Sequence, residues 1–301
     1  MPTDPWAGWL DGVEREASRN RWATLLRCQA RDRVLAQAGL RPGAVVVDLG
    51  CGLGLLSLEA ARLVGPEGRV YAVDADREAL EELRVKVEEA GLANVSPVYA
   101  EITNLPLPAG EADAVVARSV FSYLEDRSKV LKECFRVLRP GGRLSVCEPL
   151  LVEEELLVNW DLELPLWEKA TAILRDNHPA YSFRRSDLVR EVREAGFTRV
   201  DFFVWYADVT RPFRDAEEAW KELEEALPGR LSPLERLLEG GMREEEIERL
   251  VRRWAEESRR FSYRDILPCC FVWGEKPLGP EGAAKNEIRS DAAESWDPGM
   301  R

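Results

Sequence analysis

The segment that most constrains the fold is a glycine turn between a strand-like pattern and a helical pattern. Residues 45–61 read VVVDLGCGLGLLSLEAA. Apolar residues lead to Asp48, glycines follow at every second position from 50 to 54, and a helical pattern then begins. A strand that turns into a helix through glycines is typical of a site where backbone N–H groups approach the polar part of a nucleotide-like ligand.

Strand-like and helical segments alternate from Arg41 to about residue 150. The expected strands are AVVVDLG, GRVYAVDAD, VSPVYAE, ADAVVARSV and RLSVCEP. This alternation predicts an α/β fold, Rossmann-like and doubly wound, with a mostly parallel seven-stranded sheet, a helical N-terminal cap and helical insertions. In such a sheet ligands bind beyond the carboxyl ends of the strands.

The sequence predicts regions of different character around this core. The expected regions are a helical N-terminal cap at 1–40, a cofactor-binding core at 41–150 and a helical lid or substrate-facing segment at 151–185. They continue with the remaining strands at 186–277, which include an acidic helical insert at about 212–262, and a disordered tail at 278–301.

Charge and composition argue against several classes of protein. The chain has 42 basic and 55 acidic residues and a net charge of −13, whereas proteins that bind nucleic acid present a basic face. No stretch of the sequence approaches the length of about 20 consecutive apolar residues that a membrane span needs. The N-terminus does not resemble a secretory signal. We therefore expect a cytoplasmic protein, either a monomer or a homodimer. Six cysteines without a C-x-x-C pair, and one histidine, predict no metal site.

Two features of the glycine turn argue against a dinucleotide. The third position of the G-x-G-x-x-G fingerprint holds Leu55, and Gly54 comes one residue early. Asp48 would repel a pyrophosphate but attract an ammonium or a sulfonium. S-adenosylmethionine has both cations, and its carboxylate suits the N–H groups at a helix start. A nicotinamide-dependent dehydrogenase is therefore the weaker alternative.

Three segments in this order and spacing, VVDLGCGLG, VYAVDAD and LRPGGRLSV, resemble the class I S-adenosylmethionine-dependent methyltransferases. Within that family the chain is most similar to the small-molecule group typified by the ubiquinone/menaquinone C-methyltransferases. The resemblance covers roughly residues 20–205, and residues 206–266 depart from it. It implies S-adenosylmethionine as the cofactor and a small-molecule methyl acceptor as the partner.

The resemblance also implies which residues bind the cofactor. Asp74 lies 24 positions after Gly50, where a carboxylate can accept both ribose hydroxyls. Ala75 and Asp76 would lie alongside the adenosine, and Asp48 would hold the ammonium directly or through water. The expected cofactor-binding residues are Asp48, Gly50, Cys51, Gly52, Asp74, Ala75, Glu101, Ile102 and Arg118.

Two of these assignments have alternatives. Glu101 stands where the family usually has an aspartate that faces the adenine amino group, and the N–H of Ile102 could make this contact instead. Arg118 and Ser119 follow the fourth strand, where the family places backbone contacts to the methionine part. Arg118 could equally be a surface arginine.

The catalytic residues are less constrained by the sequence. Methyl transfer is an in-line displacement that depends mainly on positioning, and a base is needed only if the acceptor must lose a proton. Tyr123 stands where many relatives carry a histidine pair, Glu148 closes the fifth strand, and His178 titrates near neutrality in the expected lid. A packed aromatic, a structural carboxylate and an ordinary loop histidine are the alternative interpretations.

The leading hypothesis is an enzyme that methylates a small molecule. Aromatic residues in 1–22 and 157–206 could form a hydrophobic cap over an apolar or aromatic acceptor, although they could equally pack helices on the sheet. A second hypothesis is a cofactor-binding protein that acts through a protein partner docked on the acidic insert. Arsenite methylation would need several converging cysteines, and Cys269 and Cys270 are neighbours whose side chains should point oppositely.

Overall fold

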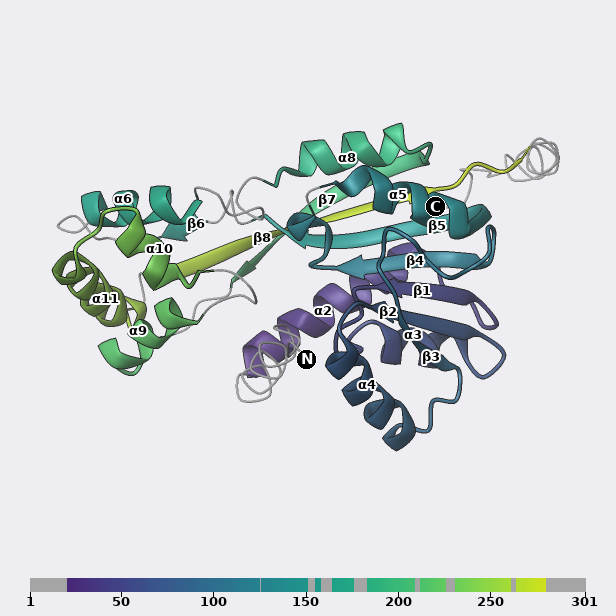
Figure 1. Cartoon of the computed structure of the whole chain (residues 1–301), viewed down its shortest axis with the longest axis horizontal. Helices are drawn as coiled ribbons and strands as arrows, with labels where there is room; N and C mark the ends of the chain where they lie inside the picture. The colour runs from purple at the N-terminus through teal and green to yellow at the C-terminus, as the bar shows by residue number, and fades with distance from the viewer. Residues whose placement is uncertain are drawn as a thin grey trace, which may run out of the picture.

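A twisted sheet with helices on both faces and a separate group of helices make up the fold (Figure 1). The structure is a computed structural model, and it describes residues 21–124, 126–150, 155–157, 164–175, 183–208, 212–225, 231–260 and 264–279. None of the helices in these ranges is long and apolar enough to cross a membrane. His178 and most of the expected tail lie outside the described residues.

The sheet has the strand order β3-β2-β1-β4-β5-β8, and β7 and the short β6 also pair with β8. Its parallel strands are β1 (Val45–Leu49), β2 (Arg69–Asp74), β3 (Val95–Tyr99), β4 (Ala112–Arg118) and β5 (Leu138–Pro149). Antiparallel to β5 runs β8 (Arg264–Glu275), which is flanked by β7 (Thr198–Asp208). Strands such as β1 and β4 are apolar almost throughout because helices bury both faces of the sheet. The predicted Rossmann-like α/β fold is confirmed.

The short strand β6 (Glu155–Leu157) adds to the seven expected strands and corrects the sequence analysis, which predicted helix throughout this region. Glu155 pairs with Ile266 of β8, and Ile266 also pairs with Asp208 of β7. Since a strand has only two edges, β6 lies on the same edge of β8 as β5. A long β8 therefore offers hydrogen-bonding groups that override the local helical pattern. The helical prediction holds for α6 (Leu164–Arg175).

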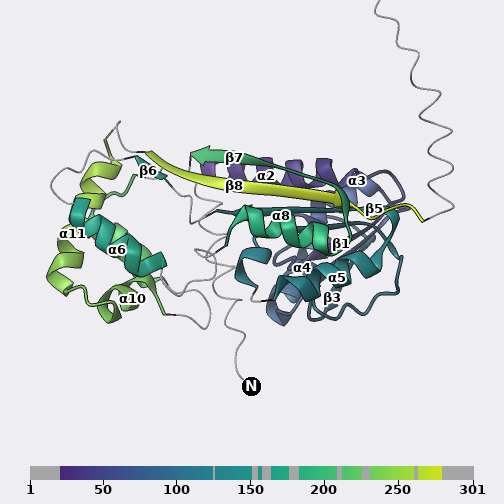
Figure 2. The ribbon, with the colours of Figure 1, turned by 90° about the horizontal axis from the view of Figure 1, so that it is seen from above.

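Two sets of helices cover the sheet (Figures 1 and 2). One face packs against α2 (Arg21–Ala38), α3 (Ser57–Val64) and α4 (Arg77–Glu89), and the other against α5 (Arg127–Val137) and α8 (Arg185–Glu194). The hydroxyl of Ser145 in β5 donates to the carbonyl of Val34 over 2.9 Å, which anchors α2 to the sheet. A short 3₁₀ helix, η1 (Phe121–Tyr123), follows β4.

The separate group consists of α6, α9 (Ala216–Glu224), α10 (Pro233–Glu239) and α11 (Glu244–Ser258), and we call it the helical unit. It has an apolar core of its own, in which the rings of Phe213 and Trp254 lie 4.6 Å apart. Ser232 and Glu235 form a capping box that starts α10. Figure 1 shows the helical unit beyond the end of the sheet towards which β4 and β5 run. Helices α9, α10 and α11 fall within the region 212–262, for which acidic helices are expected.

Candidate functional site

The glycine turn after β1 adopts conformations that favour glycine. Gly50, Gly52 and Gly54 have φ angles of +60°, +48° and +90°. A Cβ atom on Gly54 would overlap the Leu83 side chain of α4, so a glycine is required there for the turn to pack on this helix. Gly54 therefore takes the packing role that the dinucleotide fingerprint gives to its third glycine.

Backbone and side-chain hydrogen bonds tie the glycine turn to β2. The N–H of Cys51 donates to the carbonyl of Val73 over 3.0 Å, and the N–H of Gly52 donates to Asp74 Oδ2 over 2.8 Å. The other carboxylate oxygen of Asp74 accepts the N–H of Asp76 over 3.0 Å. These bonds bring together Cys51, Gly52 and Asp74, which the sequence analysis assigned to one site.

Asp48 and Asp74 place two carboxylates beside this turn. Asp48 is only 1% exposed, and burial raises its pKa to about 7, although the Ser57 hydroxyl donates to Asp48 Oδ2 over 2.5 Å. Burial also raises the pKa of Asp74, and the hydrogen bond from the Gly52 N–H partly offsets this rise. Among the described residues, no lysine or arginine forms an ion pair with either carboxylate. Two acidic groups without a basic partner favour a cationic ligand.

The two residues after Asp74 have different environments. Ala75 is exposed and can face a ligand. Asp76 is 3% exposed and caps α4 by accepting the N–H groups of Glu78 and Ala79 over 2.8 and 3.0 Å. The cap explains why this position carries an aspartate, a role that the sequence analysis did not assign.

The end of β3 supplies the expected adenine side of the site. Glu101 is exposed, and Ile102 is partly buried against the apolar core. The sequence analysis missed Tyr99, whose side chain is 50% exposed. The guanidinium of Arg77 lies over its ring, 3.6 Å from the ring centroid. Their contact could have been inferred only from the pairing of β2 with β3, which brings Tyr99 beside Asp74.

Glu148 binds the chain that follows β4. It is fully buried, and Oε1 accepts the N–H groups of Val120 and Phe121 while Oε2 accepts that of Ser122, each over 3.0 Å. Burial raises the pKa of Glu148, and the three N–H groups act in the opposite direction. Because both oxygens bind backbone groups, the geometry supports the structural interpretation of Glu148.

The remaining candidates lie nearby or outside the described residues. Tyr123 is half-buried and ends η1. Arg118 of β4 pairs in register with Cys147 of β5. A hydrogen bond from the Cys147 thiol lowers the pKa of Cys269, and the charge of Arg118 lowers it further. The sequence analysis missed this contact between the free thiols of Cys147 and Cys269, because Cys147 was interpreted as the interior of a strand. Cys269 and Cys270 do belong to opposite faces of the sheet.

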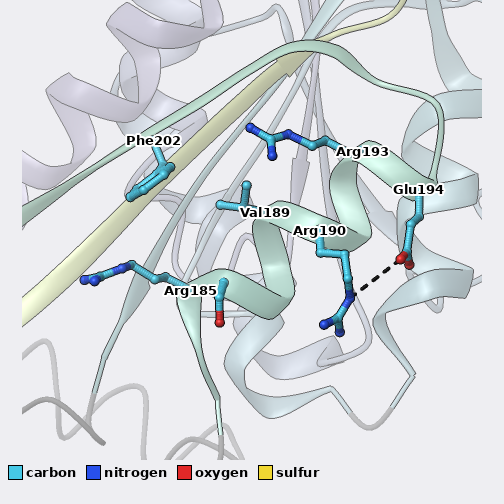
Figure 3. Close-up of a pocket in the computed structure, with 7 residues that line it drawn as sticks. Arg185, Val189, Arg190, Arg193, Glu194 and Phe202 are labelled. Carbon is cyan, nitrogen blue, oxygen red and sulfur yellow. Dashed lines mark ion pairs between the residues drawn. The ribbon is translucent and has the colours of Figure 1, made fainter.

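A separate hollow of about 380 Å³ lies between α8 and β7 (Figure 3). Figure 3 shows the side chains of Arg185 and Arg193 on α8, with Val189 between them, on the side of the helix that faces the ring of Phe202. Arg190 forms an ion pair of 3.6 Å with Glu194 along the same helix. None of the expected site residues lines this hollow, which is therefore distinct from the candidate site at the ends of β1 to β5.

Comparisons with known proteins identify relatives of the core of this chain. Residues 46–142 match the family described as a methyltransferase domain. A ubiquinone/menaquinone biosynthesis C-methyltransferase from Marinomonas is 38% identical over 124 residues, 41% of this chain and 49% of that protein. An uncharacterized 37.1 kDa protein in a transposon of Streptomyces fradiae is 33% identical over 187 residues, 60% of this chain and 49% of that protein. The chain thus spans about half the length of the curated relatives it matches.

Solved structures show the same fold. A structure from Bacillus halodurans has a TM-score of 0.55 and 18% identity, and the match covers 82% of this chain and 99% of that one. The YcgJ protein from Bacillus subtilis has a TM-score of 0.51 and 17% identity, with 83% and 99% covered. A phosphoethanolamine N-methyltransferase from Haemonchus contortus, solved with S-adenosylmethionine, has a TM-score of 0.50 and 17% identity, with 82% and 52% covered.

Proposed function

The core of this chain is a class I S-adenosylmethionine-dependent methyltransferase domain similar to the ubiquinone/menaquinone C-methyltransferases, and we propose that the chain methylates a small apolar or aromatic molecule. S-adenosylmethionine is the cofactor of this family. The proposal includes the nature of the acceptor and the atom that receives the methyl group. It also includes the state of assembly, which is a monomer or a homodimer.

The observation that carries this proposal is the pair of acidic groups around the glycine turn. Asp48 is buried and Asp74 is partly buried, and neither has an ion-pair partner among the described residues. A cofactor with a sulfonium and an ammonium would supply the missing positive charge, whereas a pyrophosphate would add to the repulsion. The residues therefore fit S-adenosylmethionine better than a nicotinamide dinucleotide.

The residues of the chain have separate roles in this proposal. Asp74 would hold the ribose hydroxyls, Asp48 the ammonium, and the exposed Ala75 would lie against the adenosine. Glu101 and Ile102 would contact the adenine from the end of β3, and Arg118 would lie towards the methionine part. The bound cofactor supplies a methyl group on a good leaving group, so the chain has mainly to align the acceptor and exclude water.

The acceptor would lie beyond the ends of β4 and β5, on the side of the helical unit. Tyr123 ends η1 there, and its hydroxyl could orient the acceptor. His178 stays a prediction, and so do the lid at 151–185, the cytoplasmic location and the absence of a nucleic-acid partner. Apolar side chains of the cap and the helical unit would exclude water and favour an apolar acceptor.

The test is calorimetric binding of S-adenosylmethionine and of S-adenosylhomocysteine to the whole chain, with NADH as a competitor. We expect micromolar affinity, on the order of −8 kcal/mol, and no competition by NADH. Transfer of labelled methyl groups to a panel of quinols, phenols and amines then identifies the acceptor class. Absence of binding by the folded protein contradicts the proposal, and binding without transfer to any acceptor favours a protein that acts through a partner.

A further inference from the structure

The buried carboxylate of Glu148 determines the path of the chain after β4. Three consecutive N–H groups, those of Val120, Phe121 and Ser122, converge on its two oxygens. An ionised carboxylate is costly to bury unless hydrogen bonds replace its water. At this site, the three backbone donors that replace the water all belong to one short segment, so a change at Glu148 acts first on that segment.

The segment does not adopt this path for local reasons. Ser119 has a φ angle of +55°, which is unfavourable for a residue other than glycine, and Val120 has φ −122° and ψ −52°. The sequence RSVFSY contains neither glycine nor proline to set such a turn. The N–H of Ser119 donates to the carbonyl of Cys147 over 2.8 Å, next to the bonds at Glu148. Contacts from β5 therefore maintain a conformation that the segment itself does not favour.

The same segment lies against the glycine turn. A Cβ atom on Gly50 would come within 2.7 Å of Val120 Cγ2, so the valine side chain packs directly on the glycine backbone. Gly50 precedes Cys51 and Gly52, whose N–H groups are bonded to Val73 and Asp74. A continuous set of contacts thus runs from Glu148 through Val120 to the turn beside Asp74.

We infer that Glu148 is a positioning residue for the cofactor, which acts by holding Val120 against Gly50. The carboxylate does not contact the cofactor or the acceptor in this role. It fixes one side of the glycine turn, while the hydrogen bonds to β2 fix the other. This inference rests on the proposed function, because it assigns the glycine turn to S-adenosylmethionine.

The central variant is Glu148→Gln, which keeps the size of the side chain. It replaces one oxygen acceptor by an N–H₂ donor, and this donor would oppose at least one of the three backbone N–H groups. We expect binding of S-adenosylhomocysteine to weaken by on the order of tenfold, as for one unsatisfied buried group. The control is Ser145→Ala in the same strand, which removes a buried hydroxyl that bonds Val34 and should lower stability without changing this affinity.

A double-mutant cycle tests the path through Val120. Val120→Ala should weaken binding of S-adenosylhomocysteine by about threefold to tenfold, because it removes the contact with Gly50. Combined with Glu148→Gln, it should weaken binding no further than Glu148→Gln alone. Independent, multiplying effects would contradict the inference, and so would unchanged affinity of a folded Glu148→Gln variant. A general loss of stability would not produce the expected non-additivity.

Amide hydrogen exchange of the ligand-free chain separates this inference from the proposed function. Glu148→Gln should speed exchange in segments 119–124 and 49–54, whereas Ser145→Ala should not. If the unaltered chain fails to bind S-adenosylhomocysteine, the proposed function fails, while the exchange still reports whether Glu148 holds both segments. If Glu148→Gln does not fold, Val120→Ala decides, and unchanged exchange at 49–54 with unchanged affinity overturns the inference.

Discussion

The N–H of Gly52 donates a 2.8 Å hydrogen bond to the carboxylate of Asp74, which joins the glycine turn after β1 to the end of β2. The N–H of Asp76 binds the other oxygen of this carboxylate over 3.0 Å. A carboxylate has about four acceptor positions, so two are used within the protein and the others can accept hydroxyl groups of a ligand. The carboxylate is thus oriented by the backbone before any ligand binds.

The first prediction concerns Asp74→Asn. The substitution keeps the shape and one acceptor oxygen but removes the charge and half of the acceptor positions. Hydrogen bonds to a charged group contribute about 1.5–3 kcal/mol each, so we expect binding of S-adenosylmethionine to weaken by about tenfold to a hundredfold. Calorimetry measures this change. Asp126→Asn, at the exposed cap of α5, is the control and should bind as the unaltered chain does.

The second prediction concerns the pH dependence that comes from Asp48. Its pKa is about 7 in the folded chain, against an ordinary value of 3.8, because burial disfavours the charged form. Between about pH 4 and pH 7 the folded state therefore binds more protons than the unfolded state. The contribution of Asp48 to the free energy of unfolding therefore falls as the pH rises through this window and levels off above it.

Asp48→Asn tests this linkage. The variant keeps an acceptor for the Ser57 hydroxyl and has no charge to bury, so its advantage in stability over the unaltered chain should grow from about pH 4 to pH 7. Denaturant unfolding across this range measures the difference. Binding of S-adenosylmethionine to the unaltered chain should strengthen with pH over the same window, because the ionised carboxylate attracts the ammonium. Parallel stability curves for the two proteins would refute this assignment.

The sequence predicted which residues stand at the strand ends of the site, because the strand and helix patterns show where each strand ends. Asp48, Gly50 and Asp74 stand at or just after the ends of β1 and β2, and parallel strands bring these ends to one edge. The Rossmann-like fold and the two acidic groups could therefore be inferred without coordinates.

Other features depend on contacts between distant segments and left no local signal. Val120 lies 70 positions from Gly50, and nothing in either segment indicates that they touch. The role of Glu148 became visible only from its three backbone partners, since a carboxylate at a strand end suggests a ligand equally well. Strand β6 exists because β8 extends beyond β5, which a local pattern cannot indicate.

The third prediction concerns Gly54→Ala. An added methyl group would overlap Leu83 of α4, and φ is +90° at this position, so both crowding and backbone strain oppose alanine. We expect the free energy of unfolding to fall by about 2–4 kcal/mol, from the strain and the overpacking together. Gly110→Ala is the matched control, since φ there is +75° but a Cβ atom would meet nothing within 4 Å. Gly110→Ala should lower the free energy of unfolding by about 1 kcal/mol, from the backbone strain alone.

The double variant Gly54→Ala with Leu83→Ala separates the two causes. Leu83→Ala alone leaves a cavity and destabilises the chain, but it also removes the group that the new methyl would meet. The combined loss should therefore be smaller than the sum of the single losses. Additive losses, measured by denaturant unfolding, would show that Leu83 does not limit the approach of α4 to the turn.

The last prediction concerns the helical unit. Glu257 in α11 is 1% exposed and forms ion pairs of 2.6 Å with Arg253 and 2.7 Å with Arg260. Glu257→Gln would leave both arginines without their buried partner, and we expect the helical unit to lose about 1–3 kcal/mol of local stability. Glu256→Gln is the control, because the Glu256 side chain is 49% exposed and its ion pair with Arg253 spans 3.5 Å, so the loss of stability should stay below about 1 kcal/mol.

Amide hydrogen exchange resolves where the Glu257→Gln substitution acts. The helical unit has its own apolar core, so faster exchange should be confined to α9 and α11, while segment 49–54 of the glycine turn stays protected. Binding of S-adenosylmethionine should then be unchanged, whereas methyl transfer to an acceptor should slow if the helical unit closes the acceptor side. Equal loss of protection at the glycine turn would mean that the sheet and the helical unit unfold together, and the helical unit could not be treated as a separate wall of the site.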